Sequence, residues 1–304
     1  MTVLISSPRK SLIIFLHLRE GRGNHSDMAT KNVVRITKVS PAYWRATISN
    51  PPLNIFDPHV YASLRLLLDA LEKDPHVRVV VFDSDVPEYF CAHYDMAWPA
   101  AGVDIPGYAP VRGDWPTFVH RLSNLRVASI ASIRGRVRGI GSEFVLACDM
   151  RFASREKAVL GQPEVGAGVA PGGGALEWLP RLCGRSRTLE IVLGSDDFDA
   201  STAELYGWVN RAVPDAELDR FVDTLARRIA GFDTFPLEGV KRVVNQRAGV
   251  ANFADLHESG LLFGRCVDTP ETQRRVKNLF AAGLQQDGET ERNLGHALSQ
   301  VTSD

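Results

Sequence analysis

Two glutamates, Glu143 and Glu164, lie in glycine-rich turns within residues 129–180, where we expect the catalytic centre of an enzyme. Glu143 closes the run Gly-Ile-Gly-Ser-Glu at 139–143, between a predicted buried strand and a predicted helix. Unpaired backbone N–H groups and the helix dipole allow such a turn to hold a developing oxyanion. Glu164 lies in the loop 161–168, whose backbone is fixed by glycine and proline. Two carboxylates brought together can divide the roles of general acid and general base.

Other functions of a glycine-rich turn agree less well with this sequence. A phosphate-binding loop would need Gly-Lys-Ser or Gly-Lys-Thr, which is absent from the turn at 139–143. The run at 166–168 lacks the third glycine of a dinucleotide-binding fingerprint, because Pro171 stands in its place. Ser142 is not a nucleophile elbow, since no glycine follows two residues later. Glu143 alone could simply stabilise its helix, so the enzymatic interpretation depends on the pair.

Alternating strands and helices are predicted to position these turns. Residues 33–48 alternate between apolar and polar side chains and are broken near Pro41, which predicts a β-hairpin. The runs at 77–82 and 128–133 are almost wholly apolar, as expected of strands buried on both faces. Helices are predicted at 60–72, around 118–125, at 143–147 and at 200–206, with further strands at 150–153 and 208–213. This order indicates an α/β fold of ββα or βαβ units.

The chain is expected to have three segments. Residues 1–30 are predicted to be a disordered extension, residues 31–214 the α/β core, and residues 215–304 a helical region. The early apolar run at 12–18 is too short to span a bilayer, and no small-residue cleavage site follows it. Residues 98–115 contain three prolines and three glycines without periodicity. A mobile lid and a plain surface connection explain that segment equally well.

Charge and cysteine content exclude several classes of protein. The 35 Lys and Arg residues nearly balance the 36 Asp and Glu residues, so no overall field attracts nucleic acid or an anionic membrane. The four cysteines are widely separated and form neither a metal-binding spacing nor a disulfide framework. They suit a reducing cytoplasm, where we expect the protein to act without a metal.

Several motifs, taken in order, resemble those of the crotonase family, the enoyl-CoA hydratase/isomerase superfamily. The resemblance runs from about residue 33 to residue 218. Its strongest parts are Ile-Ala-Ser-Ile-Arg-Gly at 130–135, Gly-Ile-Gly-Ser-Glu at 139–143, Ala-Cys-Asp at 147–149, Gly-Gln-Pro-Glu at 161–164, Pro-Gly-Gly-Gly at 171–174 and Leu-Pro-Arg-Leu-Cys-Gly at 179–184. It extends to Asn-Pro-Pro-Leu-Asn at 50–54, Val-Arg-Val-Val-Val at 77–81, Phe-Cys-Ala-His-Tyr-Asp at 90–95 and Ala-Glu-Leu-Tyr-Gly-Trp-Val-Asn at 203–210. The number and order of these motifs carry the resemblance.

The resemblance implies a fold, a substrate and roles for particular residues. The fold would be a crotonase-type spiral of ββα units with a C-terminal helical oligomerisation region, assembled as trimers or dimers of trimers. The substrate would be a coenzyme A thioester, with no tightly bound cofactor. Its enolate would be held by the backbone N–H groups of Tyr94 and Ile140. Glu143 and Glu164 would flank a water molecule, which the backbone at Gly172 would help to position.

Some residues depart from the usual pattern of the family. His93 and Tyr94 stand where the first oxyanion loop usually has small residues, and Ile140 stands where the second is usually glycine. His93 could be an acid/base group or a packed side chain. Arg134, Arg136 and Arg138 alternate beside the turn, and Arg138 in particular could bind a substrate carboxylate or a phosphate, or lie on a solvated loop. The lysine that relatives often place near the coenzyme A phosphates is absent from residues 279–285, and Lys241 or Arg242 could replace it.

These residues predict an enoyl-CoA hydratase-like enzyme that adds water to a 2-enoyl-CoA. Isomerisation, C–C hydrolysis or decarboxylation of another acyl-CoA is the enzymatic alternative, favoured if Arg138 faces the acyl pocket. A non-catalytic crotonase-fold oligomer is the alternative from another class, and it predicts that Tyr94 or Ile140 closes the pocket. The hydratase hypothesis predicts an open pocket in which Glu143 and Glu164 can share a water molecule.

Overall fold

The computed structural model describes residues 13–14, 33–97 and 111–301 of the chain. The predicted lid or connection at 98–115 therefore lies mostly outside the described residues, and only its last part is described, as the start of a helix. Of the predicted extension 1–30, only Ile13–Ile14 is described. These two residues form β1, which pairs antiparallel with the following strand.

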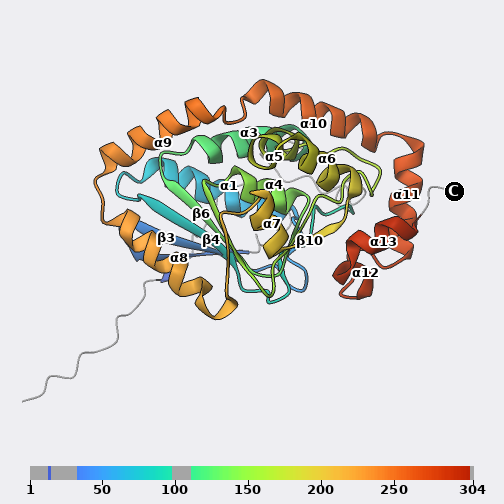
Figure 1. Ribbon diagram of the computed structural model, residues 1–304, viewed down its shortest axis with the longest axis horizontal. Coiled ribbons are helices and arrows are strands. Elements are labelled where there is room, and N and C mark those ends of the chain that lie inside the picture. Colours follow the sequence, from blue (N-terminus) through green and yellow to red (C-terminus); the bar gives the residue numbers. More distant parts are fainter. Residues whose placement is uncertain (1–12, 15–32, 98–110, 302–304) are drawn as a thin grey trace, which may run out of the picture.

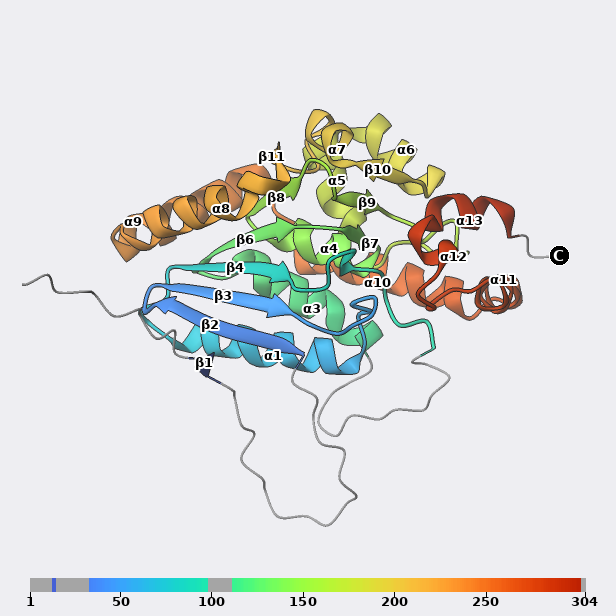
Figure 2. The same cartoon turned by 90° about the horizontal axis from the view of Figure 1, so that it is seen from below.

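Seven strands form the larger sheet, in the order β1-β2-β3-β4-β6-β8-β11. The predicted hairpin is confirmed as β2 (Val34–Ser40) and β3 (Tyr43–Ile48). From β3 onward the pairing is parallel, with β4 (Val79–Ser84), β6 (Ala128–Ile133), β8 (Met150–Ser154) and β11 (Arg211–Val213). Figure 2 shows these strands side by side, with helices on both faces.

Burial on both faces explains the apolar runs of the central strands. Val80 and Phe82 of β4 face one hydrophobic cluster, while Val79 and Val81 face another, because successive side chains of a strand point to opposite faces. The first cluster includes side chains of α1 (Pro58–Lys73), α3 (Val111–Asn124) and α4 (Ile140–Ala147), and the second includes those of α8 (Asp215–Ala230). Helix α1 begins where Asp57 caps it, its Oδ1 accepting the Val60 N–H at 2.9 Å.

A second, smaller sheet has the order β10-β9-β7-β5 and was not predicted from the sequence. Strands β5 (Tyr89–Cys91), β7 (Arg136–Arg138) and β9 (Val159–Gly161) are mutually parallel, and β10 (Asp197–Asp199) is antiparallel to β9. One expectation is corrected here, because the buried strand β6 does not lead directly into the helix of Glu143. Strand β7 intervenes, and α4 begins at Ile140 rather than at Glu143.

Beyond Asp215 the described chain is helical, as predicted. Helices α9 (Thr234–Ala248) and α10 (Phe253–Val267) run along one edge of the molecule, and α10 packs on α3 (Figure 1). Helices α11 (Pro270–Ala281), α12 (Glu289–Arg292) and α13 (Leu294–Gln300) gather at one end, where α13 contacts β10. Helices α5 (Ala175–Cys183) and α6 (Arg185–Gly194) connect β9 to β10 within the small sheet, and α7 (Ala200–Tyr206) connects β10 to β11. Of these three helices only α7 was predicted.

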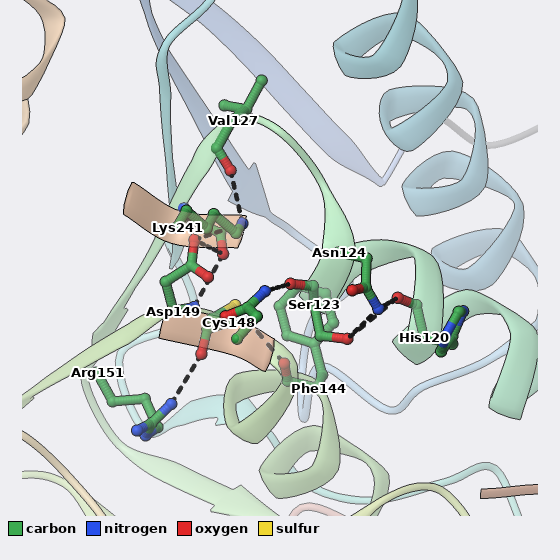
Figure 3. Close-up of polar contacts among 11 residues, drawn as sticks. His120, Ser123, Asn124, Val127, Phe144, Cys148, Asp149, Arg151 and Lys241 are labelled. Carbon is green, nitrogen blue, oxygen red and sulfur yellow. Dashed lines mark hydrogen bonds and ion pairs between the residues drawn. The ribbon is translucent and has the colours of Figure 1, made fainter. Parts of the chain in front are cut away.

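Helix α9 is attached to the core through partly buried polar contacts. Lys241 Nζ donates to Asp149 Oδ2 at 2.7 Å and to Val127 O at 3.0 Å, while Asn245 Nδ2 donates to Ser123 O at 3.0 Å (Figure 3). Lys241 is therefore engaged in the fold. No helix in the described part of the chain is long and apolar enough to cross a membrane.

Candidate active site

A cavity of about 100 Å³ contains both predicted carboxylates, Glu143 and Glu164. Tyr94, Ile140 and Gly172 also line it. This volume is enough for several water molecules or a short acyl chain. Most of the remaining wall is apolar and includes Met96, Trp115, Pro163, Val169, Phe263, Leu279, Leu284, Leu294 and Leu298. The bulky side chains at Tyr94 and Ile140 border the cavity without closing it.

The small sheet brings the site residues together. Strand β7 pairs with β5 on one side and with β9 on the other, in parallel. Their carboxyl ends therefore meet at one edge, which is where parallel sheets commonly bind ligands. Tyr94 follows β5, Ile140 and Glu143 follow β7, and Glu164 follows β9.

A short parallel bridge to Phe56 holds the loop that follows β5. The Phe56 N–H donates to His93 O at 2.9 Å, and the Asp95 N–H donates to Phe56 O at 3.1 Å. Because the peptide group is planar and trans, the Tyr94 N–H points opposite to the His93 carbonyl, away from Phe56. That orientation agrees with the oxyanion role expected of the Tyr94 amide.

The loop that follows β7 presents the Ile140 amide at the start of α4. Gly139 has φ of +52°, a left-handed conformation that favours glycine. Its carbonyl accepts the first helical hydrogen bond, from the Glu143 N–H at 2.9 Å. The Ile140 N–H therefore points out of the helix N-terminus, without a partner inside the helix. The end of β5 touches the start of α4 at Gly141, where an added Cβ would lie 2.6 Å from Cys91 Cβ.

Two donors hold the buried carboxylate of Glu143. Its Oε1 accepts the Gly173 N–H at 2.6 Å, and its Oε2 accepts the indole N–H of Trp115 at 3.1 Å. Burial raises the pKa of Glu143 to about 7, although both donors lower it, and the charge of Glu177 raises it further. Glu143 can therefore change protonation state near neutral pH.

The carboxyl group of Glu164 has fewer donors. Its Oε2 lies 3.3 Å from Gln162 Nε2, and an added Cβ at Gly139 would lie 2.9 Å from its Oε1. Burial raises the pKa of Glu164 well above its ordinary value, and the negative charge of Glu143 raises it further. The two carboxyl groups therefore influence each other's protonation, and the donors favour Glu143 as the ionised member.

Gly172 lies on the cavity wall, but its neighbour makes the contact with the carboxylate. Gly172 packs so tightly that an added Cβ would lie 2.6 Å from Phe263 Cβ. The N–H that reaches Glu143 belongs to Gly173. A role of Gly172 in positioning water stays a prediction.

His93 also lines the cavity, and both of its ring nitrogens are engaged by the protein. Its Nδ1 lies 2.7 Å from Tyr94 O, and its Nε2 lies 2.9 Å from Glu291 Oε1. Neither ring nitrogen is therefore directed at a substrate. This geometry favours the packed side chain over the acid/base group among the two roles considered from the sequence.

Arg138 does not face the cavity, which corrects the expectation that it could bind substrate. Its side chain is fully buried, and its guanidinium donates to both carboxylate oxygens of Asp197 at 2.7 and 2.6 Å. Arg134 pairs with Asp215 at 2.8 Å, and Arg136 pairs with Glu88 at 3.0 Å. All three arginines therefore hold parts of the fold together. Lys241 and Arg242 line a separate hollow that shares no residue with the cavity of the glutamates.

Three residues at the site were not identified from the sequence: Trp115, Gly173 and Glu291. Trp115 was considered only as the end of a proline-rich segment, and Gly173 only as part of a glycine run. Glu291 is 198 positions from His93, and no local pattern connects them. No group of three or more His, Cys, Asp or Glu residues in the described part of the chain could hold a metal ion.

Comparisons with known proteins agree with this geometry. The family model of enoyl-CoA hydratase/isomerase matches residues 43–279. A Dictyostelium discoideum protein described as a probable mitochondrial enoyl-CoA hydratase is 34% identical over 191 residues, covering 60% of this chain and 68% of the relative. Human mitochondrial methylglutaconyl-CoA hydratase is 27% identical over 277 residues, covering 86% of this chain and 78% of the relative.

Solved structures show the same fold. The crystal structure of a Streptomyces avermitilis protein, described as a candidate enoyl-CoA hydratase, superposes with a TM-score of 0.82. It is 43% identical and covers 91% of this chain and 100% of that chain. Together with the family match, which spans most of the chain, this similarity identifies the spiral core and the C-terminal helices as a crotonase fold. The chain belongs to the enoyl-CoA hydratase/isomerase family, the crotonase superfamily.

Proposed function

We propose that this protein is an enoyl-CoA hydratase-like enzyme that adds water to the double bond of a 2-enoyl-CoA. The supporting observation is the pair of glutamates in one cavity, whose surroundings favour different protonation states. Glu143 accepts hydrogen bonds from Gly173 and Trp115, as an ionised carboxylate would. Glu164 has fewer donors and lies near the charge of Glu143, which favours its protonated form.

This division assigns the proton transfers. Glu143 takes a proton from water as the water oxygen bonds to Cβ, and the electrons of the double bond move onto the thioester. The N–H groups of Tyr94 and Ile140 stabilise the resulting enolate oxygen. Glu164 then gives its proton to Cα, so the product gains the elements of one water molecule. Loss of one such backbone donor typically costs roughly 10²–10³ in rate.

We infer that the acyl chain is apolar. Among the residues that the structure describes, the cavity is lined by leucines of the C-terminal region, including Leu279, Leu284 and Leu294, and by neither lysine nor arginine. Arg138, which would have favoured a substrate with an extra carboxylate, pairs with Asp197 instead. Thermal-shift measurements with butyryl-CoA and glutaryl-CoA test this point, and greater stabilisation by glutaryl-CoA would contradict it.

We also propose self-association as a trimer or a dimer of trimers. Helix α9 exposes Phe235, Val240 and Val244, whose exposed fractions are 88%, 63% and 55%. Apolar side chains exposed together in this way commonly mark a protein interface.

The four free cysteines support a reducing compartment such as the cytoplasm, and coenzyme A would enter only as part of the substrate.

Hydration of crotonyl-CoA tests the proposed reaction. Loss of the enoyl thioester absorbance is followed with wild-type protein and with Glu164→Gln. We expect turnover by the wild type and a decrease of roughly 10²–10⁴ in the variant, the range typical of a general acid or base. Wild-type turnover no faster than that of the variant would reject the hydratase proposal.

A further inference from the structure

The C-terminal region contributes a buried ion pair beside the oxyanion loop. Glu291 of α12 is fully buried, and its Oε1 lies 2.9 Å from Nε2 of His93. The histidine side chain is 7% exposed and lines the cavity. Because His93 directly precedes Tyr94, this pair lies next to the amide that would hold the enolate oxygen.

The neighbours of the His93 ring determine how many protons it carries. Nδ1 lies 2.7 Å from the carbonyl oxygen of Tyr94, which can only accept a hydrogen bond, so Nδ1 must carry a proton. Nε2 faces Glu291 Oε1, which also accepts the Gln285 N–H at 2.6 Å. An ionised carboxylate at that position requires a proton on Nε2 as well. The arrangement is that of an imidazolium paired with a carboxylate.

Arg138 acts on the pair in two directions, because its charge disfavours a protonated His93 and favours an ionised Glu291. Arg138 of β7 donates to Glu291 O at 2.7 Å, and its own charge is balanced by Asp197 of β10. Glu143 and Glu164 line the same cavity as His93. Burial and the charge of Arg138 lower the pKa of His93, but Glu291 raises it above the ordinary value, and His93 lowers the pKa of Glu291 against the effect of burial.

The chain around Glu291 also holds the oxyanion loop directly. Gln285 Nε2 donates to Asp95 Oδ1 at 2.9 Å, and the Met96 N–H donates to Gln285 Oε1 at 2.7 Å. These contacts fix the loop on the C-terminal side of Tyr94, and the His93 ion pair fixes its N-terminal side. The Phe56 bridge holds both sides, through His93 O and the Asp95 N–H.

We propose that Glu291 is a positioning residue that keeps His93 as an imidazolium beside the Tyr94 amide, where its positive charge stabilises the enolate. This inference rests on the proposed function. Both N–H groups of the ring are used within the protein, so His93 would act through its charge rather than by donating to substrate. A charge in a buried site acts more strongly than one in water, because the local dielectric constant is lower.

Kinetics of Glu291→Gln test the proposal, because an uncharged partner lets His93 lose its proton above its ordinary pKa of about 6.5. At pH 8 we expect kcat for crotonyl-CoA hydration to decrease about tenfold, with a smaller change in KM. This decrease in kcat is smaller than the roughly 10²–10³-fold decrease expected when a direct oxyanion donor is lost. The ratio of variant to wild-type kcat should recover towards pH 5.5. His93→Gln should also lower kcat, but its ratio of variant to wild-type kcat should not recover towards pH 5.5.

Asp149→Asn is the matched control, since it removes a carboxylate from the partly buried ion pair with Lys241, away from the cavity. Its kcat ratio should not depend on pH. A Glu291→Gln ratio that is constant from pH 5.5 to 8 would overturn the proposal, because loss of packing alone gives that result.

Nuclear magnetic resonance of ¹⁵N-histidine separates this inference from the proposed function. At pH 7.5 we expect both ring nitrogens of His93 to be protonated in the wild type and one to be bare in Glu291→Gln, with His93→Gln providing the assignment. A bare nitrogen in the wild type would overturn the proposal even if the enzyme hydrates crotonyl-CoA. If the His93 ring is doubly protonated but the protein hydrates no enoyl-CoA, the ion pair with Glu291 is confirmed and its role in stabilising an enolate is rejected.

Discussion

At the residue scale, the surroundings of Glu143 and Glu164 differ in their hydrogen-bond donors. Glu143 lies between the Gly173 N–H and the Trp115 indole, whereas Glu164 Oε2 accepts a longer hydrogen bond, from Gln162 Nε2 at 3.3 Å. Hydrogen bonds to a carboxylate favour its charged form, so the two groups have separate protonation states at one pH. Single residues around the pair therefore control the pH range of the reaction.

Replacement of Trp115 by phenylalanine should move the acidic limb of the pH–rate profile. Trp115→Phe removes a hydrogen-bond donor to Glu143, which raises the pKa of that carboxyl group above the value of about 7. We expect kcat/KM to decrease several-fold at pH 6.5 and to recover towards pH 9, since more base is ionised there. Trp208→Phe is a matched control, because this buried tryptophan does not line the cavity. An unchanged acidic limb in Trp115→Phe would contradict the assignment of Glu143 as the base.

The raised pKa of Glu143 also affects stability. Its pKa is about 7 in the folded protein and 4.5 as the ordinary value, so between these values the folded state binds more protons than the unfolded state. The free energy of unfolding contributed by this group therefore falls as the pH rises from 4.5 through 7. Glutamine cannot lose a proton, so Glu143→Gln lacks this loss of stability. The free energy of unfolding of the variant minus that of the wild type should therefore be higher at pH 8 than at pH 5, by on the order of 1–3 kcal/mol.

Urea denaturation at the two pH values measures this difference. Glu204 is exposed, and Glu204→Gln provides the control. Its free energy of unfolding should differ from that of the wild type by a similar amount at pH 5 and at pH 8. An equal effect of Glu143→Gln at pH 5 and pH 8 would show that the folded carboxyl group titrates normally.

At the scale of elements, three short parallel strands of the small sheet position the site. The end of β5, next to the loop that carries Tyr94, touches the start of α4, where Gly141 lies against Cys91. Gly141→Ala would place a methyl group 2.6 Å from Cys91 Cβ, so the two amide-bearing loops must move apart. We expect kcat to decrease at least tenfold, because oxyanion donors act only at close range.

The double variant Gly141→Ala/Cys91→Gly should restore part of the activity by removing the contacting atoms. Gly194→Ala, where an added Cβ meets nothing within 4 Å, should leave activity unchanged. Full activity of Gly141→Ala would mean that the two loops do not depend on this contact.

The strand 128–133 and the helix 200–206 are confirmed at their predicted bounds. The apolar run at 128–133 is almost continuous, as expected of a strand that is buried on both faces. Strands β5, β7 and β9 have three residues each, too few to show a period of two. The glycine turns identified Glu143 and Ile140, but the contact between His93 and Glu291 depends on tertiary folding across 198 positions. No local signal could reveal that contact.

At the scale of the whole molecule, the C-terminal helices complete the cavity that the core begins. Phe263 of α10, Leu279 of α11 and Leu298 of α13 form part of its wall. Glu291 and Gln285 in the same region contact the oxyanion loop. The region beyond residue 214 is therefore part of the site as well as a candidate for oligomerisation.

The exposed apolar side of α9 should mediate self-association. Phe235→Lys/Val244→Lys replaces two side chains that are 88% and 55% exposed, so it should dissociate an oligomer without disturbing the core of the subunit. Sedimentation velocity should show a trimer or larger for the wild type and a monomer for this variant. Leu205→Lys on α7, 71% exposed, is the control and should not dissociate a trimer. A monomeric wild type would refute the proposed assembly.

The most direct test of the account is a double-mutant cycle on the two glutamates, with hydration of crotonyl-CoA as the measurement. Because Glu143 and Glu164 would act on one substrate as a unit, Glu143→Gln and Glu164→Gln should each lower kcat by roughly 10²–10⁴. The double variant should then be little slower than either single variant, as is typical of residues that act together. A single variant that keeps the wild-type rate, or effects that multiply fully in the double variant, would contradict it.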